Sequence, residues 1–237
     1  MERLKERIKT FKSIREAKKY YKKNLLDLHH KLIDFYNSLF DTNLRISIEF
    51  SSGPPAFDPE KKKVIFGGLH MHETVANKLG ISLKSLCFSS LANEEAKRYY
   101  FHVNPFFQKN VNGMRGVGVA HVIVRYLELM SGEKFEPLNT EIALLFLEGV
   151  GSAASHRALD EFGLWDAKLL EEKCYETLKN KKYYSLEELA EKGIPAMYFG
   201  FDFKKFFKVI RHFYNLSEKS FRREVRRDPR EIYKKIF

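Results

Sequence analysis

The first forty residues show a helical pattern of hydrophobic positions. Apolar side chains recur every three or four residues from Leu4 to Phe40, and charged residues occupy the other faces. This spacing predicts one long or kinked amphipathic helix, ended by Asp41-Thr42-Asn43. Residues 44–50 then alternate between apolar and polar side chains, which predicts a half-buried strand.

A second strand is predicted at Val64-Ile65-Phe66, before Gly67-Gly68. The connection between the two strands contains Pro54, Pro55 and Pro59, so the pair predicts a β-hairpin or meander with a long, stiff connection. Residues 69–90 have no clear period, and we predict a loop there with one short element near residues 83–88.

The rest of the chain predicts a series of helices with breaks at known stop signals. The Asn104-Pro105 pair interrupts the first of them. A later helix follows an N-cap at 137–140 and ends before Gly163. Ser185 and Glu188 match a capping box. The predicted helices span residues 91–108, about 117–131, 141–162, 166–178, 185–192, 204–214 and 217–237.

These elements predict an α+β fold that is predominantly helical. A small N-terminal β-hairpin or meander precedes a helical C-terminal half. No internal repeat or long linker divides the 237 residues. We therefore expect one compact unit, in which a basic N-terminal helix (1–43) packs on a domain formed by residues 44–237.

Composition narrows the class of protein. The chain is 44% hydrophobic and 31% charged, which is typical of a soluble globular protein. No apolar run approaches the roughly 20 residues that span a bilayer, and no secretory leader is visible, so we expect no membrane association. The two cysteines, Cys87 and Cys174, fit a reduced cytoplasmic location. The single glutamine, Gln108, is a feature of proteins from hot environments.

The positive charge lies at the two ends of the chain. Residues 1–31 hold 11 Lys and Arg against 4 Asp and Glu, residues 217–237 hold 8 against 4, and the interval between them is balanced. Such asymmetry can recruit an anionic partner, and nucleic-acid binding through the basic termini is one hypothesis. The alternative is that both ends are solvated helix surfaces, and no base-reading motif accompanies them.

The candidate chemistry lies in the predicted helix 117–131 and in Glu148. His121 and Arg125 are four residues apart and share a helix face, with Val122 beside His121. Glu148 lies in Leu147-Glu148-Gly149-Val150-Gly151, where small residues allow two helices to approach closely. His156 follows Glu148 by about two helical turns.

This arrangement resembles the active site of gluzincin-type zinc metallopeptidases of the zincin-like (peptidase MA-like) group. In that family an H-E-x-x-H helix supplies two zinc ligands and the general base, and a glutamate in an E-G-x-A run on a later helix supplies the third ligand. His121 matches the first ligand position and Glu148 the third. The resemblance covers roughly residues 44–230, although residues 67–115 match poorly. It implies a zincin-like fold.

The departures from the motif imply a lost activity. Val122 replaces the general base, and Arg125 replaces the second ligand. A valine cannot accept a proton from a metal-bound water, and a guanidinium repels a cation. We therefore predict that Arg125 takes the place of the metal charge and pairs with Glu148 or Glu128. The expected protein is a catalytically degenerate, non-enzymatic scaffold or binding domain, with no cofactor and with a peptide or protein segment in the former cleft.

Two alternatives stay open at the level of sequence. A zinc hydrolase could survive with a relocated ligand set of His121, Glu148 and His156. Equally, His121 can be a hydrogen-bonded structural histidine, and Glu148 a surface glutamate beside a close-packing glycine. The His70-Met71-His72-Glu73 segment is a weaker metal candidate, and we predict that it lies in a loop.

Overall fold

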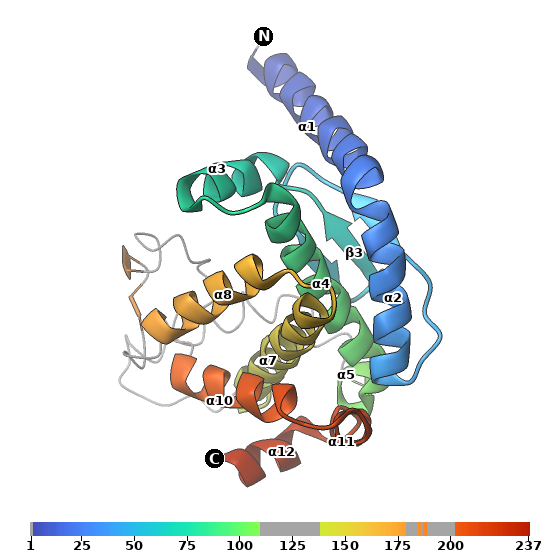
Figure 1. Ribbon diagram of the computed structural model, residues 1–237, viewed down its shortest axis with the longest axis vertical. Helices are drawn as coiled ribbons and strands as arrows, with labels where there is room; N and C mark the ends of the chain where they lie inside the picture. Colours follow the sequence, from blue (N-terminus) through green and yellow to red (C-terminus); the bar gives the residue numbers. More distant parts are fainter. Residues whose placement is uncertain (1, 110–137, 179–183, 186, 189–201) are drawn as a thin grey trace.

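The fold is mostly helical, with one small sheet, as the hydrophobic pattern predicts (Figure 1). A computed structural model describes residues 2–109, 138–178, 184–185, 187–188 and 202–237. Across these residues, every helix is too short or too polar to cross a membrane.

Two N-terminal helices replace the single long helix of the prediction, as its kinked form allows. Helix α1 spans Glu2–Asn24 and α2 spans Leu26–Phe40. The backbone hydrogen bonds continue through the break, because Leu25 donates to Tyr21 and His29 donates to Leu25. The predicted stop is confirmed: Asp41 adopts a left-handed conformation (φ 55°) and its N–H bonds to the last turn of α2.

The sheet corrects the predicted hairpin. Strands β1 (Ile48–Phe50) and β3 (Lys63–Phe66) pair in parallel, and β2 (Ala56–Asp58) pairs antiparallel with β3 on its other side. The strand order is therefore β1-β3-β2, which is not that of a meander. The error lies in the connection, where Ala56-Phe57-Asp58 forms a strand that is too short to give a period.

Residues 69–90 are helical, and the loop predicted there is wrong. Helix α3 spans Leu69–Leu79 and α4 spans Leu83–Val103. Within α3, His72 is buried and bonds to Gly68 and Ser90, whereas the side chain of His70 is 92% exposed, so these two histidines do not share a ligand. The predicted break after α4 is confirmed, because Asn104 caps it and α5 (Pro105–Lys109) follows.

The helices predicted at 141–162, 166–178 and 204–214 are confirmed, whereas the single helix predicted at 217–237 is wrong, because Asp228-Pro229 begins a second helix there. The helix predicted at 117–131 lies outside the described residues, as does most of the one predicted at 185–192. Helix α7 begins at Leu138 and ends at Glu161, before Gly163 with its positive φ of 67°. The capping box is present, since the Ser185 N–H donates to Glu188 and the Glu188 N–H donates to the Ser185 hydroxyl. The remaining helices are α8 (Trp165–Leu178), α10 (Phe203–Tyr214), α11 (Glu218–Glu224) and α12 (Pro229–Ile236).

Helix α4 runs through the middle of the molecule, and most of the other elements pack against it (Figure 1). It packs against α7 most extensively, and also against α2, α3, α5, α8 and the sheet. Nearly all of its second half is therefore buried, including three charged residues: Glu95, Lys97 and Arg98. Such residues are rarely buried unless they are paired.

One buried polar chain joins α4 to α1 and α2. The Glu95 carboxylate lies 2.9 Å from Nε2 of His29 and accepts a 2.7 Å hydrogen bond from Nε of Arg98. The other ring nitrogen of His29 lies 2.6 Å from the Tyr21 hydroxyl. Nη1 of Arg98 donates to the carbonyl of Arg45, ahead of β1. Since both His29 and Glu95 are fully buried, their contacts are shielded from water.

Removing the carboxylate of this chain should destabilise the fold strongly. Glu95→Ala leaves the guanidinium of Arg98 buried without its carboxylate and His29 without its Nε2 partner. We expect a loss of about 3–5 kcal/mol in the free energy of unfolding, measured by urea denaturation. The control is Glu161→Ala, an exposed glutamate at the end of α7, with a change within about 0.5 kcal/mol. Equal losses in the two variants would contradict this assignment.

Candidate functional site

Two glycines of α7 allow neighbouring helices to approach its backbone, as the sequence predicts. A Cβ at Gly151 would lie 2.9 Å from Cγ of Lys97 on α4, and one at Gly149 would lie 2.6 Å from Cγ1 of Val209 on α10. Both distances are too short for a real side chain. The missing side chains therefore bring Glu148 against α4 on one side and let α10 close the other.

At this contact, the ammonium of Lys97 lies between two glutamates. Its Nζ is 2.8 Å from Oε2 of Glu148 on α7 and 2.9 Å from Oε1 of Glu94, one turn earlier on α4. The three side chains are only 6–13% exposed. Because water is largely excluded from these ion pairs, their electrostatic attraction is screened far less than that of a surface ion pair.

The pKa values of this group show how its charges depend on one another. Burial raises the pKa of Glu94, and the nearby Glu148 charge adds to that effect, while Lys97 opposes it. Burial alone would lower the pKa of Lys97, but the two carboxylates outweigh it and hold that pKa above its usual value. Lys97 is therefore a fixed positive charge, and it favours the ionised form of Glu94.

A third carboxylate lies on the other side of the same cleft. Glu171, on α8, lies 2.9 Å from Nε2 of His156 and accepts a hydrogen bond from the Ser89 hydroxyl of α4. His156 is buried, and it stands two turns after Glu148 on α7. Nearby, Asn93 donates to the hydroxyl of Ser152 at 3.2 Å, a second polar link between α4 and α7.

These groups surround a polar cavity of about 280 Å³, open to solvent on one side. Among the described residues that line it, three are carboxylates and one is an ammonium, so these side chains together carry a negative formal charge when all are ionised. A cavity of this charge favours a cationic or hydrogen-bond-donating ligand. It is lined by Pro55, Ser90, Asn93, Glu94, Lys97, Glu148, Ser152 and Glu171.

The structure places two of the predicted site residues at this cavity or beside it. Glu148 lines it, and the buried His156 bonds to the lining residue Glu171. The other predicted positions, His121, Val122 and Arg125, lie outside the described residues, as does Glu128. Within the described residues, no three His, Cys, Asp or Glu side chains are arranged to hold a metal ion.

The most important residue that sequence reasoning missed is Lys97. Glu94 and Lys97 are three residues apart on a predicted helix, which is the ordinary pattern of a solvated ion pair. The stretch from Glu94 to Arg98 holds four charges in five positions, a density that is typical of a surface helix. One feature of the sequence does indicate burial: residues 91–101 leave no face of the helix consistently polar, whereas a surface helix has one polar face.

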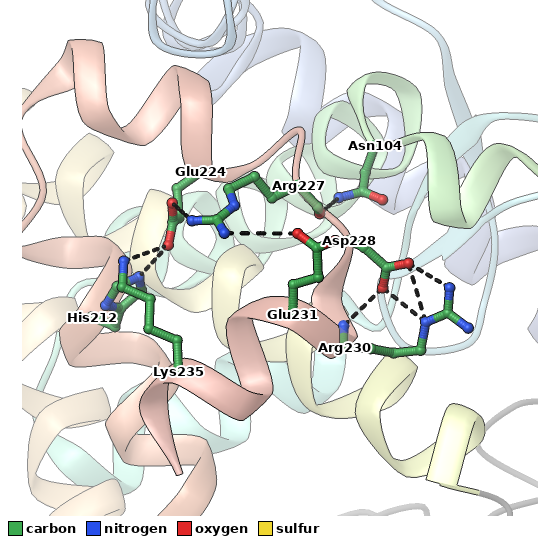
Figure 2. A network of polar contacts seen from close by, with 8 residues as sticks. All are labelled: Asn104, His212, Glu224, Arg227, Asp228, Arg230, Glu231 and Lys235. Carbon is green, nitrogen blue, oxygen red and sulfur yellow. Dashed lines mark hydrogen bonds and ion pairs between the residues drawn. The ribbon is translucent and has the colours of Figure 1, made fainter.

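The two basic ends lie at opposite poles of the molecule (Figure 1). In the second half of α1, the exposed cations carry no ion pair within the part of the chain that the structure describes; they are Arg15, Lys18, Lys19, Lys22 and Lys23. The C-terminal end differs, because Arg227 and Lys235 pair with the buried Glu224, and Arg230 pairs with Asp228 (Figure 2). The two ends therefore do not form one continuous basic surface.

The chain was compared with known protein families, curated proteins and solved structures. No protein-family model, no curated protein and no solved structure matches this chain.

The paired charges of the cleft predict a pH-dependent loss of stability when Lys97 is replaced. Lys97→Met keeps an apolar stem but removes the ammonium that contacts both Glu94 and Glu148. We expect a loss of about 3–5 kcal/mol at pH 7.5, measured by urea denaturation. The loss should be smaller at pH 5, because a carboxyl group with a raised folded-state pKa contributes stability at low pH that is lost as pH rises.

The matched control is Lys84→Met, an exposed lysine on the same helix. Its effect should be within about 0.5 kcal/mol at both pH values. A Lys97→Met variant whose loss did not change between pH 5 and pH 7.5 would show that the carboxylates do not depend on this ammonium.

Proposed function

We propose that this protein is a catalytically degenerate, zincin-like domain that binds a peptide or protein segment without hydrolysing it. The motif supports the loss of chemistry, because Val122 stands at the general-base position and Arg125 at the second ligand position. The described site supports the same conclusion through a different residue, Lys97.

One observation carries this proposal: the 2.8 Å contact between Lys97 and Glu148. The resemblance gives Glu148 the role of third zinc ligand. A buried ammonium at that distance stabilises the charged carboxylate, and it repels a divalent cation from the same oxygen. Lys97 thus takes the part that the sequence assigned to Arg125, whose position lies outside the described residues.

The charge of the cleft favours one class of ligand. Among the described lining residues, three carboxylates share one ammonium, that of Lys97, so this part of the lining carries more negative than positive charge. The Glu171 side chain is 23% exposed, whereas those of Glu94 and Glu148 are 13% and 6% exposed, so Glu171 is the most accessible of the three carboxylates. A peptide that presents a lysine side chain or a free terminal amine is therefore the expected ligand.

The first test concerns metal. We expect protein purified without added zinc to contain far less than one equivalent by mass spectrometry of its metals. We also expect its unfolding temperature to be unchanged by a chelator or by equimolar zinc, because a metal bound only to the folded state would raise it. One equivalent of zinc, with chelator-sensitive stability, would support the residual hydrolase with a relocated ligand set.

The second test concerns the ligand. A pool of fluorescent hexapeptides with free lysines should bind and be recovered intact by mass spectrometry, whereas the same pool with acetylated amines should bind at least tenfold more weakly. Glu171→Gln should weaken binding of the free-lysine pool, and Glu161→Gln, an exposed glutamate outside the cleft, should not. Cleaved peptides, or equal binding of both pools, would contradict the proposal.

A further inference from the structure

A second pocket lies on another side of α4 and shares no lining residue with the Glu148 cleft. Its volume is about 370 Å³, within the range of small-molecule sites. Residues from the segment before β1, from β2, from the β2–β3 turn and from α4 and α5 surround it. They are Leu44, Phe57, Lys62, Arg98, Phe101, His102 and Gln108.

Among the described residues that line this pocket, Lys62 and Arg98 are cationic and none is acidic. Lys62 and Arg98 supply two positive charges. Their field is also seen at His102, because burial lowers the pKa of that imidazole and the charges of Lys62 and Arg98 lower it further. Arg98 is paired with Glu95, which does not line the pocket, so the uncompensated charge of the described lining is that of Lys62, and a cation without a carboxylate beside it in the lining favours an anion.

Arg98 adds a second, independent indication of a ligand. Its side chain is only 6% exposed, and two of its nitrogens are bonded, Nε to Glu95 and Nη1 to the Arg45 carbonyl. The third, Nη2, is buried and has no hydrogen-bond acceptor among the residues that the structure describes. Buried donors nearly always have a partner, so an acceptor from a ligand would complete this guanidinium.

The opposite part of the lining is aromatic. The Phe57 and Phe101 rings meet edge to face at 5.5 Å between their centroids, and Leu44 lies beside them in the same pocket. Apolar surface of this kind holds the body of a small molecule, while the charged residues orient its polar end.

We propose that this pocket binds a small organic anion. A carboxylate or phosphate group is held by Arg98 and Lys62, and an apolar or aromatic body lies against Phe57 and Phe101. This site is separate from the peptide cleft, and it does not depend on whether the zincin resemblance or the peptide ligand is correct.

The β2–β3 turn offers a matched pair of variants. Lys62 has a left-handed backbone (φ 53°), a conformation that asparagine adopts readily, so Lys62→Asn removes the charge and keeps the turn. Lys61 is the adjacent residue; it pairs with Glu49 and Asp58 and does not line the pocket. Lys61→Asn makes the same change in net charge one residue away.

Calorimetric titration of the full chain with three probes tests the proposal: phenyl phosphate, inorganic phosphate and benzyl alcohol. Phenyl phosphate combines the anion and the apolar body, so it should bind more tightly than either of the other two. Lys62→Asn should weaken phenyl phosphate by about five- to tenfold, as expected for one lost charge-assisted contact, and Lys61→Asn by less than about twofold.

Each other result would overturn the proposal. Absence of phenyl phosphate binding, or an unchanged affinity in Lys62→Asn, would show that the pocket is not an anion site. An equal loss in Lys61→Asn would mean that the anion responds to the general positive charge of the surface. Equal affinity for benzyl alcohol would show an apolar pocket in which the cations take no part.

Discussion

The structure depends on how α4 buries charge on two of its faces. Glu94 and Lys97 form one pair facing α7, and Glu95 and Arg98 form another facing α1, α2 and the segment before β1. Each pair is completed by a residue from another element, Glu148 in the first case and His29 in the second. Burying four charges on one helix is costly unless every one is paired. Helix α4 therefore requires its neighbours to dock in one arrangement, and the cleft beside Glu148 is a result of that docking.

Much of the fold could be predicted from local signals. The left-handed end of α2 at Asp41, the break at Asn104, the end of α7 before Gly163 and the Ser185 capping box are all set by a few adjacent residues. The predictions failed where tertiary contacts decide. Strand β2 has only three residues and forms because β3 is beside it, and helix α3 buries only His72 and Ala76, so no stripe of large apolar residues reveals it.

The candidate site was predictable only where local signals determine it. Gly149 and Gly151 indicate close helix packing beside Glu148, and the structure has that packing. The described cation that pairs with Glu148 is Lys97, which lies 51 positions earlier and on a helix that the pattern did not distinguish from a surface helix. Spacing along one helix cannot reveal a partner that is brought in from another element. Glu171, which contacts the predicted candidate His156, comes from α8 in the same way.

In the function that we propose, the Lys97 ammonium occupies the place of a metal ion beside Glu148. Diffraction from crystals grown with excess zinc, collected on both sides of the zinc absorption edge, tests it most directly. The account predicts no anomalous peak within bonding distance of Glu148, about 2 Å, and density that joins the Lys97 nitrogen to that carboxylate. A zinc ion bound to Glu148, with Lys97 displaced from it, would contradict the account.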